Sequence, residues 1–184
     1  MSQIVKKIND IKLIHTNFNF DKRGFFFEIY NIKRYRKLGI KDNFIQNSIS
    51  VSKKNVLRGL HFTVKNPQSQ IVTVLEGKIF DCLVDLRIKS RNFLKHYCFL
   101  LKKNQNNQLY MPPGFAHGFC VLSEKVVLHY SASKTYDYSN SSGLIWNDKK
   151  IKIKWPIKKP IISNRDKNFQ DIDTLIRLKK LPKT

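Results

Sequence analysis

Short runs of β-branched, aliphatic and aromatic residues, separated by polar stretches, recur about every ten residues along the chain. Runs of this length and spacing are typical of strands in an antiparallel sandwich or barrel. We therefore predict ten strands, at residues 11–20, 25–30, 44–51, 56–62, 70–75, 79–86, 95–101, 108–111, 116–122 and 126–134.

Turn signals lie between several of these runs. Glu76-Gly77-Lys78 separates two apolar runs and predicts a hairpin turn. Pro112-Pro113-Gly114 predicts a turn because proline cannot donate a hydrogen bond within a sheet. Residues 104–107 are polar and predict a loop.

Helical signals are few. Residues 31–38, followed by Gly39, predict a short helix with a glycine at its C-terminal cap. Residues 171–180 predict another, because acidic residues come early and basic residues late, as the helix dipole favours. Many short strands with little helix indicate a mainly β fold, a closed or jelly-roll β-barrel with a few short helices.

The length of 184 residues predicts a single domain, residues 1–184, and the 41% hydrophobic content is enough for a sizeable core. No apolar run approaches the ~18 residues of a membrane span, and residues 1–9 lack the features of a signal peptide. Cys82, Cys98 and Cys120 lie in apolar runs and are odd in number. We expect buried free thiols, a cytoplasmic location and no membrane partner.

The chain is strongly basic, with 35 Lys and Arg against 13 Asp and Glu and a formal net charge of +22. A nucleic-acid-binding barrel is therefore one alternative function. The distribution argues against it, since 27 of the 35 basic residues are Lys, spread along the whole chain, whereas base and phosphate readers favour Arg. We expect a solvated basic surface that helps to gather anionic ligands, and we consider nucleic acid an unlikely partner.

Two of the five histidines, His61 and His117, have distinctive surroundings. On a regular strand Gly59 and His61 would face one side and Arg58 the other, because side chains alternate. His61 would then point into a barrel cavity if its side lines the interior. His117 follows a Pro-Gly turn, and no set of three or four convergent ligands is visible, so we expect no metal.

Several ordered segments between about residues 10 and 168 carry a specific resemblance. They are Arg23-Gly24-Phe25-Phe26-Phe27-Glu28, Lys53 to Phe62, Gly77 to Asp81, Val84 to Arg87, Pro113-Gly114-Phe115-Ala116-His117-Gly118-Phe119, Gly143 to Asp148, and Trp155-Pro156. Together they resemble the dTDP-4-dehydrorhamnose 3,5-epimerase family. The resemblance implies a cupin-type jelly-roll β-barrel, a homodimer, a nucleotide-sugar substrate, and no metal or redox cofactor.

The resemblance also implies roles for individual residues. A 4-keto sugar has acidified hydrogens at C3 and C5, so a base on one face and an acid on the other can invert these carbons through an enolate. His61 matches the base, Asp166 the carboxylate that supports it, and Tyr130 the acid. The implied substrate-binding positions are Arg23, Glu28, Gln46, Ser48, Arg58, Gln70 and His117.

The chain departs from the family pattern in three places. Gln70 stands where the family usually has a Lys that supports the enolate, Thr63 stands where Gln is common, and Ser48 follows Asn47 where Asn is frequent. These positions adjoin the implied substrate. They leave open a single-site epimerase that inverts only C3 or C5 of another nucleotide-linked 4-keto sugar, and a sugar-binding cupin without turnover.

Overall fold

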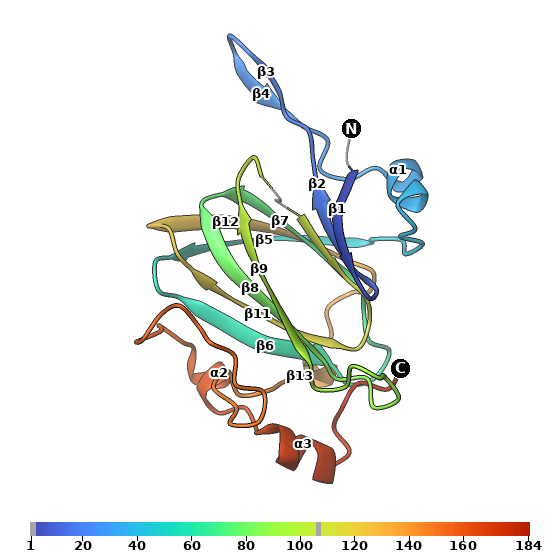
Figure 1. Ribbon diagram of the computed structural model, residues 1–184, viewed down its shortest axis with the longest axis vertical. Helices are drawn as coiled ribbons and strands as arrows, with labels where there is room; N and C mark the ends of the chain where they lie inside the picture. The colour runs from blue at the N-terminus through green and yellow to red at the C-terminus, as the bar shows by residue number, and fades with distance from the viewer. Residues whose placement is uncertain (1–2, 106–107) are drawn as a thin grey trace.

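The computed structural model describes residues 3–105 and 108–184, and most strands lie in two facing antiparallel sheets (Figure 1). The larger sheet has the strand order β1 (Gln3–Ile8), β2 (Ile11–His15), β10 (Gln108–Met111), β7 (Gln70–Glu76), β12 (Lys125–Ala132) and β5 (Gln46–Lys53). The smaller sheet has the order β13 (Ser141–Gly143), β6 (Leu57–Thr63), β11 (Phe115–Val121), β8 (Lys78–Asp85) and β9 (His96–Lys102). This architecture confirms the mainly β, jelly-roll prediction.

The chain passes repeatedly from one sheet to the other. Strands β7 and β8 belong to different sheets, so the hairpin predicted at Glu76-Gly77-Lys78 is wrong and the turn connects the two layers instead. Gly77 has φ +85°, and a Cβ at this position would lie 2.2 Å from the backbone oxygen of Lys125. The turn at Pro112-Pro113-Gly114 is confirmed and also connects the two sheets.

The main core lies between the sheets. Val72, Val74 and Leu128 of the larger sheet pack in one buried cluster with Leu83 and Phe119 of the smaller sheet. Every residue of the central strand β11 is buried, because one face meets this core and the other is covered by later segments of the chain. The alternating apolar pattern of the strands therefore produces a closed two-layer barrel.

Two clusters outside the barrel hold the helices in place. Helix α1 (Ile32–Lys37) is capped by Asn31 and packs Tyr35 against the larger sheet. Helices α2 (Asn164–Lys167) and α3 (Ile172–Arg177) lie beside the smaller sheet, where α3 buries Ile172 and Leu175 (Figure 1). Both predicted helices are confirmed in shorter form, whereas α2, β1 and β13 were not predicted.

Some segments differ from the predicted strands. The run at residues 11–20 ends after His15, and the next two strands, β3 (Asn19–Asp21) and β4 (Gly24–Phe26), form a hairpin that projects from the barrel (Figure 1). The polar loop predicted at 104–107 falls partly outside the described residues, since 106 and 107 are not among them. Within the described part of the chain, no helix is long and apolar enough to cross a membrane.

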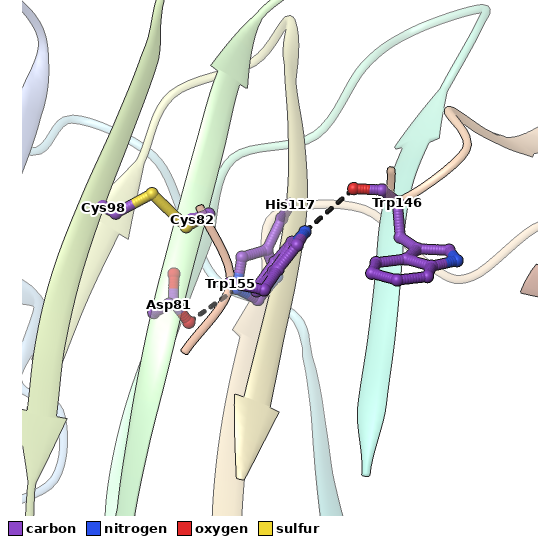
Figure 2. The surroundings of a disulfide bond; sticks show 6 residues. All are labelled: Asp81, Cys82, Cys98, His117, Trp146 and Trp155. Carbon is purple, nitrogen blue, oxygen red and sulfur yellow. Dashed lines mark hydrogen bonds and ion pairs between the residues drawn. A yellow bond between two sulfur atoms is a disulfide. The ribbon is translucent and has the colours of Figure 1, made fainter. Parts of the chain in front are cut away.

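The expectation of three free thiols is wrong for two of the cysteines. Cys82 on β8 and Cys98 on β9 form a disulfide, and only Cys120 is a free, buried thiol (Figure 2). The two partners lie directly opposite each other in the antiparallel register of these strands, with 4.2 Å between their Cα atoms. Strand register decides this contact, and the position of a cysteine within an apolar run does not reveal it.

Candidate active site

A cavity of about 320 Å³ opens between the two sheets. His61, Arg58 and His117 line it from the smaller sheet, and Tyr130 and Gln70 line it from the larger sheet. Five of the predicted site residues therefore share one cavity. Asp166 is buried behind it and contacts His61 directly.

His61 is held by Asp166. Its Nε2 lies 2.9 Å from Oδ1 of Asp166, while Oδ2 of the same carboxylate accepts a hydrogen bond from the backbone N–H of Gly59 at 2.9 Å. Asp166 itself sits in α2, whose N-cap Ser163 accepts a hydrogen bond from the Asp166 backbone N–H. The ring of Phe169 contacts the His61 ring edge-on. This frame fixes the orientation of the imidazole and leaves part of the ring exposed to the cavity.

Arg58 and His61 line the same cavity, which corrects the expectation that they face opposite sides of the strand. The register of β6 against β11 shifts here, because His61 pairs with His117 and Arg58 pairs with Phe119. Three steps along β6 therefore match two steps along β11. This bulge turns Arg58 to the face of His61.

Glycine at position 59 makes the bulge possible. Its φ is +121°, and a Cβ there would lie 2.5 Å from Cα of Gly118 and 2.7 Å from the backbone oxygen of His117. We expect Gly59→Ala to lower the free energy of unfolding by about 1–3 kcal/mol in a urea titration. Gly24→Ala is the matched control, because Gly24 also has a positive φ but nothing lies within 4 Å of its added Cβ. Equal losses in the two variants would contradict the proposed close contact.

The surroundings of Asp166 favour its ionised form at neutral pH. Burial alone would raise its pKa, but the hydrogen bonds from His61 and Gly59 more than offset this and lower the pKa below its ordinary value of 3.8. Because the folded pKa is the lower one, Asp166 stabilises the fold above about pH 3.8, and this stabilisation is lost as the pH falls through the folded value.

We therefore expect acidification below pH 3.8 to reduce the free energy of unfolding more in the native chain than in Asp166→Asn. Urea titrations at a series of acidic pH values measure the difference between the two curves. Parallel curves for the native chain and the variant would show that this carboxylate does not carry the effect.

Tyr130 reaches the cavity from β12, in the sheet opposite His61. Its hydroxyl lies 3.2 Å from Oγ of Ser50 on the neighbouring strand β5. Burial raises the pKa of Tyr130 to about 12, and the nearby Asp81 adds to this effect. The phenol is therefore protonated at neutral pH and able to donate a proton.

A second histidine–carboxylate pair lies deeper in the same cavity. Nε2 of His117 on β11 is 2.8 Å from Oδ2 of Asp81 on β8, and both side chains are buried (Figure 2). The other oxygen of Asp81 has no hydrogen-bond partner among the described residues. His117 thus lines the cavity as predicted, with a fixed ring orientation.

The remaining predicted residues lie at or beyond the rim. Gln46 accepts a hydrogen bond from the backbone N–H of Tyr136, which lines the cavity, whereas Ser48 does not line it. Arg23 is 84% exposed at its side chain and pairs with Asp21 on the projecting hairpin. Glu28 pairs with Arg34 of α1. The fold of a single chain does not bring Arg23 or Glu28 into this cavity.

Arg165 and Ser50 also line the cavity and were not predicted as site residues. Arg165 donates hydrogen bonds to the hydroxyl of Tyr136 and to Oγ of Ser141. Arg165 directly precedes Asp166 in the sequence, and this adjacency is the sequence signal that could have identified it as a site residue. With Arg58, it gives the cavity two fixed guanidinium groups, which suit phosphate oxygens.

Together, the jelly-roll barrel and an imidazole–carboxylate pair facing a protonated phenol define a cupin-type enzyme of acid–base chemistry. The family model described as dTDP-4-dehydrorhamnose 3,5-epimerase matches residues 5–174. The chain belongs to this family.

Individual relatives agree with the family assignment. A dTDP-4-dehydrorhamnose 3,5-epimerase from Shigella flexneri is 38% identical over 96% of this chain and 100% of its own length. The crystal structure of a dTDP-6-deoxy-D-glucose-3,5-epimerase from Legionella pneumophila, in complex with dTDP-4-keto-L-rhamnose, superposes with a TM-score of 0.92 at 34% identity, covering 100% of this chain and 99% of that one. A dTDP-4-dehydrorhamnose 3-epimerase from Streptomyces niveus is 34% identical over 150 residues, which cover 80% of this chain and 72% of its own length.

Proposed function

We propose that the chain inverts C3 and C5 of a dTDP-linked 4-keto-6-deoxy sugar, converting dTDP-4-dehydro-6-deoxy-glucose to dTDP-4-dehydrorhamnose. One observation carries the proposal: an oriented imidazole and a protonated phenol reach one cavity from opposite sheets. A protein that only binds sugar needs no such pair. Residues 1–184 would form one domain for this reaction, supported by the core that the two sheets share.

The chemistry follows from the positions of the groups. The C4 carbonyl acidifies the hydrogens at C3 and C5, and in a gluco-configured chair both lie on the same face of the ring. His61 would take each proton in turn, with Asp166 stabilising the imidazolium that forms. Tyr130 would return a proton to the opposite face of the carbon, which inverts it. Before the second inversion, the tyrosinate would regain a proton from solvent and the His61 imidazolium would release the proton it took to solvent.

The intermediate enolate needs a donor near its oxygen. Arg58 is the group that we assign to this task, because it lines the cavity and its Nε is held by Oγ of Ser52 at 3.0 Å. The neutral Gln70 and the Asp81-paired His117 would hydrogen-bond the sugar hydroxyls. Arg165 would bind a phosphate oxygen.

A dimer would complete the site. Arg23 and Glu28 match substrate-binding positions but lie outside the cavity of their own chain, on or beside the projecting hairpin. Phe20, Phe25 and Phe26 of this hairpin are exposed, as are Ile49 and Val51 on the edge strand β5. Exposed apolar side chains on a projecting arm favour a homodimer in which the arm reaches the partner's cavity.

This arrangement predicts complementation between two defective variants. Arg23→Ala and His61→Asn should each have little activity alone, and the mixed, re-equilibrated pair should recover about a quarter of native activity, since half of the dimers carry one intact site. Steady-state rates after mixing measure the recovery, and two Arg23→Ala preparations mixed together are the control. A mixture with no gain in rate would place Arg23 and His61 in the same site of one chain.

The function itself is tested by incubating the native chain with dTDP-4-keto-6-deoxy-D-glucose and reading the sugar configuration from proton NMR coupling constants. We expect the L-configured product. Tight binding with an unchanged substrate would instead establish the non-catalytic cupin.

A single-site epimerase is the second candidate. It is favoured by the neutral Gln70, which lines the cavity and stands, by the family resemblance, where a Lys is usual, and by the similarity to a relative named as a 3-epimerase. The NMR product would then be inverted at one carbon only.

A cytoplasmic location stays a prediction. The Cys82–Cys98 disulfide removes one of its supports, because structural disulfides are rare in reducing compartments. Fractionation of cells that produce the chain tests the location.

A further inference from the structure

A second cavity, of about 440 Å³, lies between two segments distant in sequence: 87–95, which follows β8, and 176–184, which contains the end of α3. We call the surface formed by these two segments the basic–apolar patch. Figure 1 shows α3 and this end of the chain at the opposite end of the long axis from the β3–β4 hairpin. The patch shares no lining residue with the cavity of His61.

The charge of the patch has a single sign. Its two segments contain eight basic residues and no acidic side chain: Arg87, Lys89, Arg91, Lys95, Arg177, Lys179, Lys180 and Lys183. Arg87 is neutralised by Asp85 and Asp10, but none of the ion pairs found within residues 3–105 and 108–184 involves the other seven. Arg177 still interacts electrostatically with Asp171, but this part of the surface presents a concentration of positive charge without close ion-pair partners.

Aliphatic side chains lie among these cations. Ile88 is 65% exposed, Ile176 is 41% exposed and Leu178 is 49% exposed. Ile88 and Ile176 line the cavity together with Leu181 and Pro182, and Lys89, Lys179 and Lys183 belong to the same lining. The surface is therefore amphipathic, because exposed aliphatic side chains and lysines line one cavity.

We propose that the basic–apolar patch docks the protein on a bilayer rich in anionic phospholipid. Lipid phosphates would meet the lysines, and Ile88, Ile176 and Leu178 would enter the boundary between headgroups and acyl chains. No membrane-spanning element is needed. The proposal departs from the expectation of no membrane partner, which rested on the absence of a long apolar run and did not consider a surface built from two separate segments.

Charge and shape favour a bilayer over other occupants. A second copy of the same patch would bring like charges together at short distance, which is unfavourable. Single-stranded nucleic acid gains most from aromatic platforms on which bases stack, whereas the exposed large apolar side chains of the patch, Ile88, Ile176 and Leu178, are aliphatic.

The test is co-sedimentation of the full chain with vesicles at physiological ionic strength. We expect binding to vesicles of equal parts phosphatidylglycerol and phosphatidylcholine, and none to phosphatidylcholine alone. The triple variant Lys89→Gln, Lys179→Gln, Lys183→Gln should bind at least about tenfold more weakly. A control triple variant with the same charge change, at the exposed Lys33 and Lys37 of α1 and at the exposed Lys41 that follows the helix, should lose less than about threefold.

A further variant, Ile88→Ser with Leu178→Ser, tests whether the aliphatic side chains enter the bilayer or whether the lysines alone attract the protein to anionic lipid. We expect it to lose binding by about fivefold or more while its net charge and its epimerase turnover stay unchanged, because it lies outside the His61 cavity. Equal losses in the two lysine triple variants, full binding by the Ile88→Ser and Leu178→Ser variant, or no sedimentation of the native chain with anionic vesicles would each overturn the proposal.

Discussion

Replacement of His61 by asparagine is expected to reduce kcat by about 10³- to 10⁴-fold, because in the proposed mechanism His61 is the base that takes protons from both carbons. Asparagine keeps a similar shape and can still hydrogen-bond Asp166, whose Oδ1 lies 2.9 Å from the imidazole. Binding of dTDP should change little. Steady-state rates and a dTDP titration measure the two effects separately.

A matched variant tests whether replacing any histidine by asparagine lowers turnover. His96 is exposed at the start of β9 and does not line the cavity, so His96→Asn should keep native turnover. Turnover of His61→Asn within a few-fold of the native rate would show that another group is the base. It would also contradict the proposed role of Asp166 as the carboxylate that supports this base.

The second large effect concerns Tyr130. We expect Tyr130→Phe to lower the rate of inversion by about 10²- to 10³-fold, since the donor on the far face is lost. Proton abstraction by His61 should persist. In deuterated water the variant should therefore exchange the hydrogens at C3 or C5 for deuterium with retained configuration, because the proton can return only from the side of His61.

The pKa of Tyr130, raised to about 12 by burial, means that the native phenol stays protonated across the neutral range.

Tyr97→Phe is the control variant. The Tyr97 hydroxyl accepts a hydrogen bond from Asn9, outside the cavity, so this variant should invert the substrate normally. Normal inversion by Tyr130→Phe at one carbon would limit the acid's role to the other carbon. Normal inversion at both would assign the acid elsewhere.

Much of the fold was predictable because its signals are local. Apolar runs located most strands, and the Pro112-Pro113-Gly114 turn follows from proline chemistry. The hairpin predicted at Gly77 was wrong because a tight turn between two strands does not reveal whether they pair or enter different sheets. The Cys82–Cys98 disulfide was missed for a similar reason, since it depends on the register of β8 and β9.

The site was predicted largely through the family resemblance. That resemblance named His61 and Tyr130, which the fold brings to one cavity from distant parts of the sequence, and Asp166, which is buried behind the cavity against His61. Strand alternation alone placed Arg58 on the wrong face, because it cannot anticipate the bulge at Gly59. Arg165 was missed because only the tertiary fold carries α2 to the cavity.

The central claim is that this cavity inverts two carbons with one base and one acid. The most direct measurement follows dTDP-4-keto-6-deoxy-D-glucose by NMR in deuterated water with the native chain. We predict deuterium at both C3 and C5 of an L-configured product. Deuterium at one carbon, with the other unexchanged, would contradict the double inversion, and no deuterium at either carbon would contradict the catalytic account as a whole.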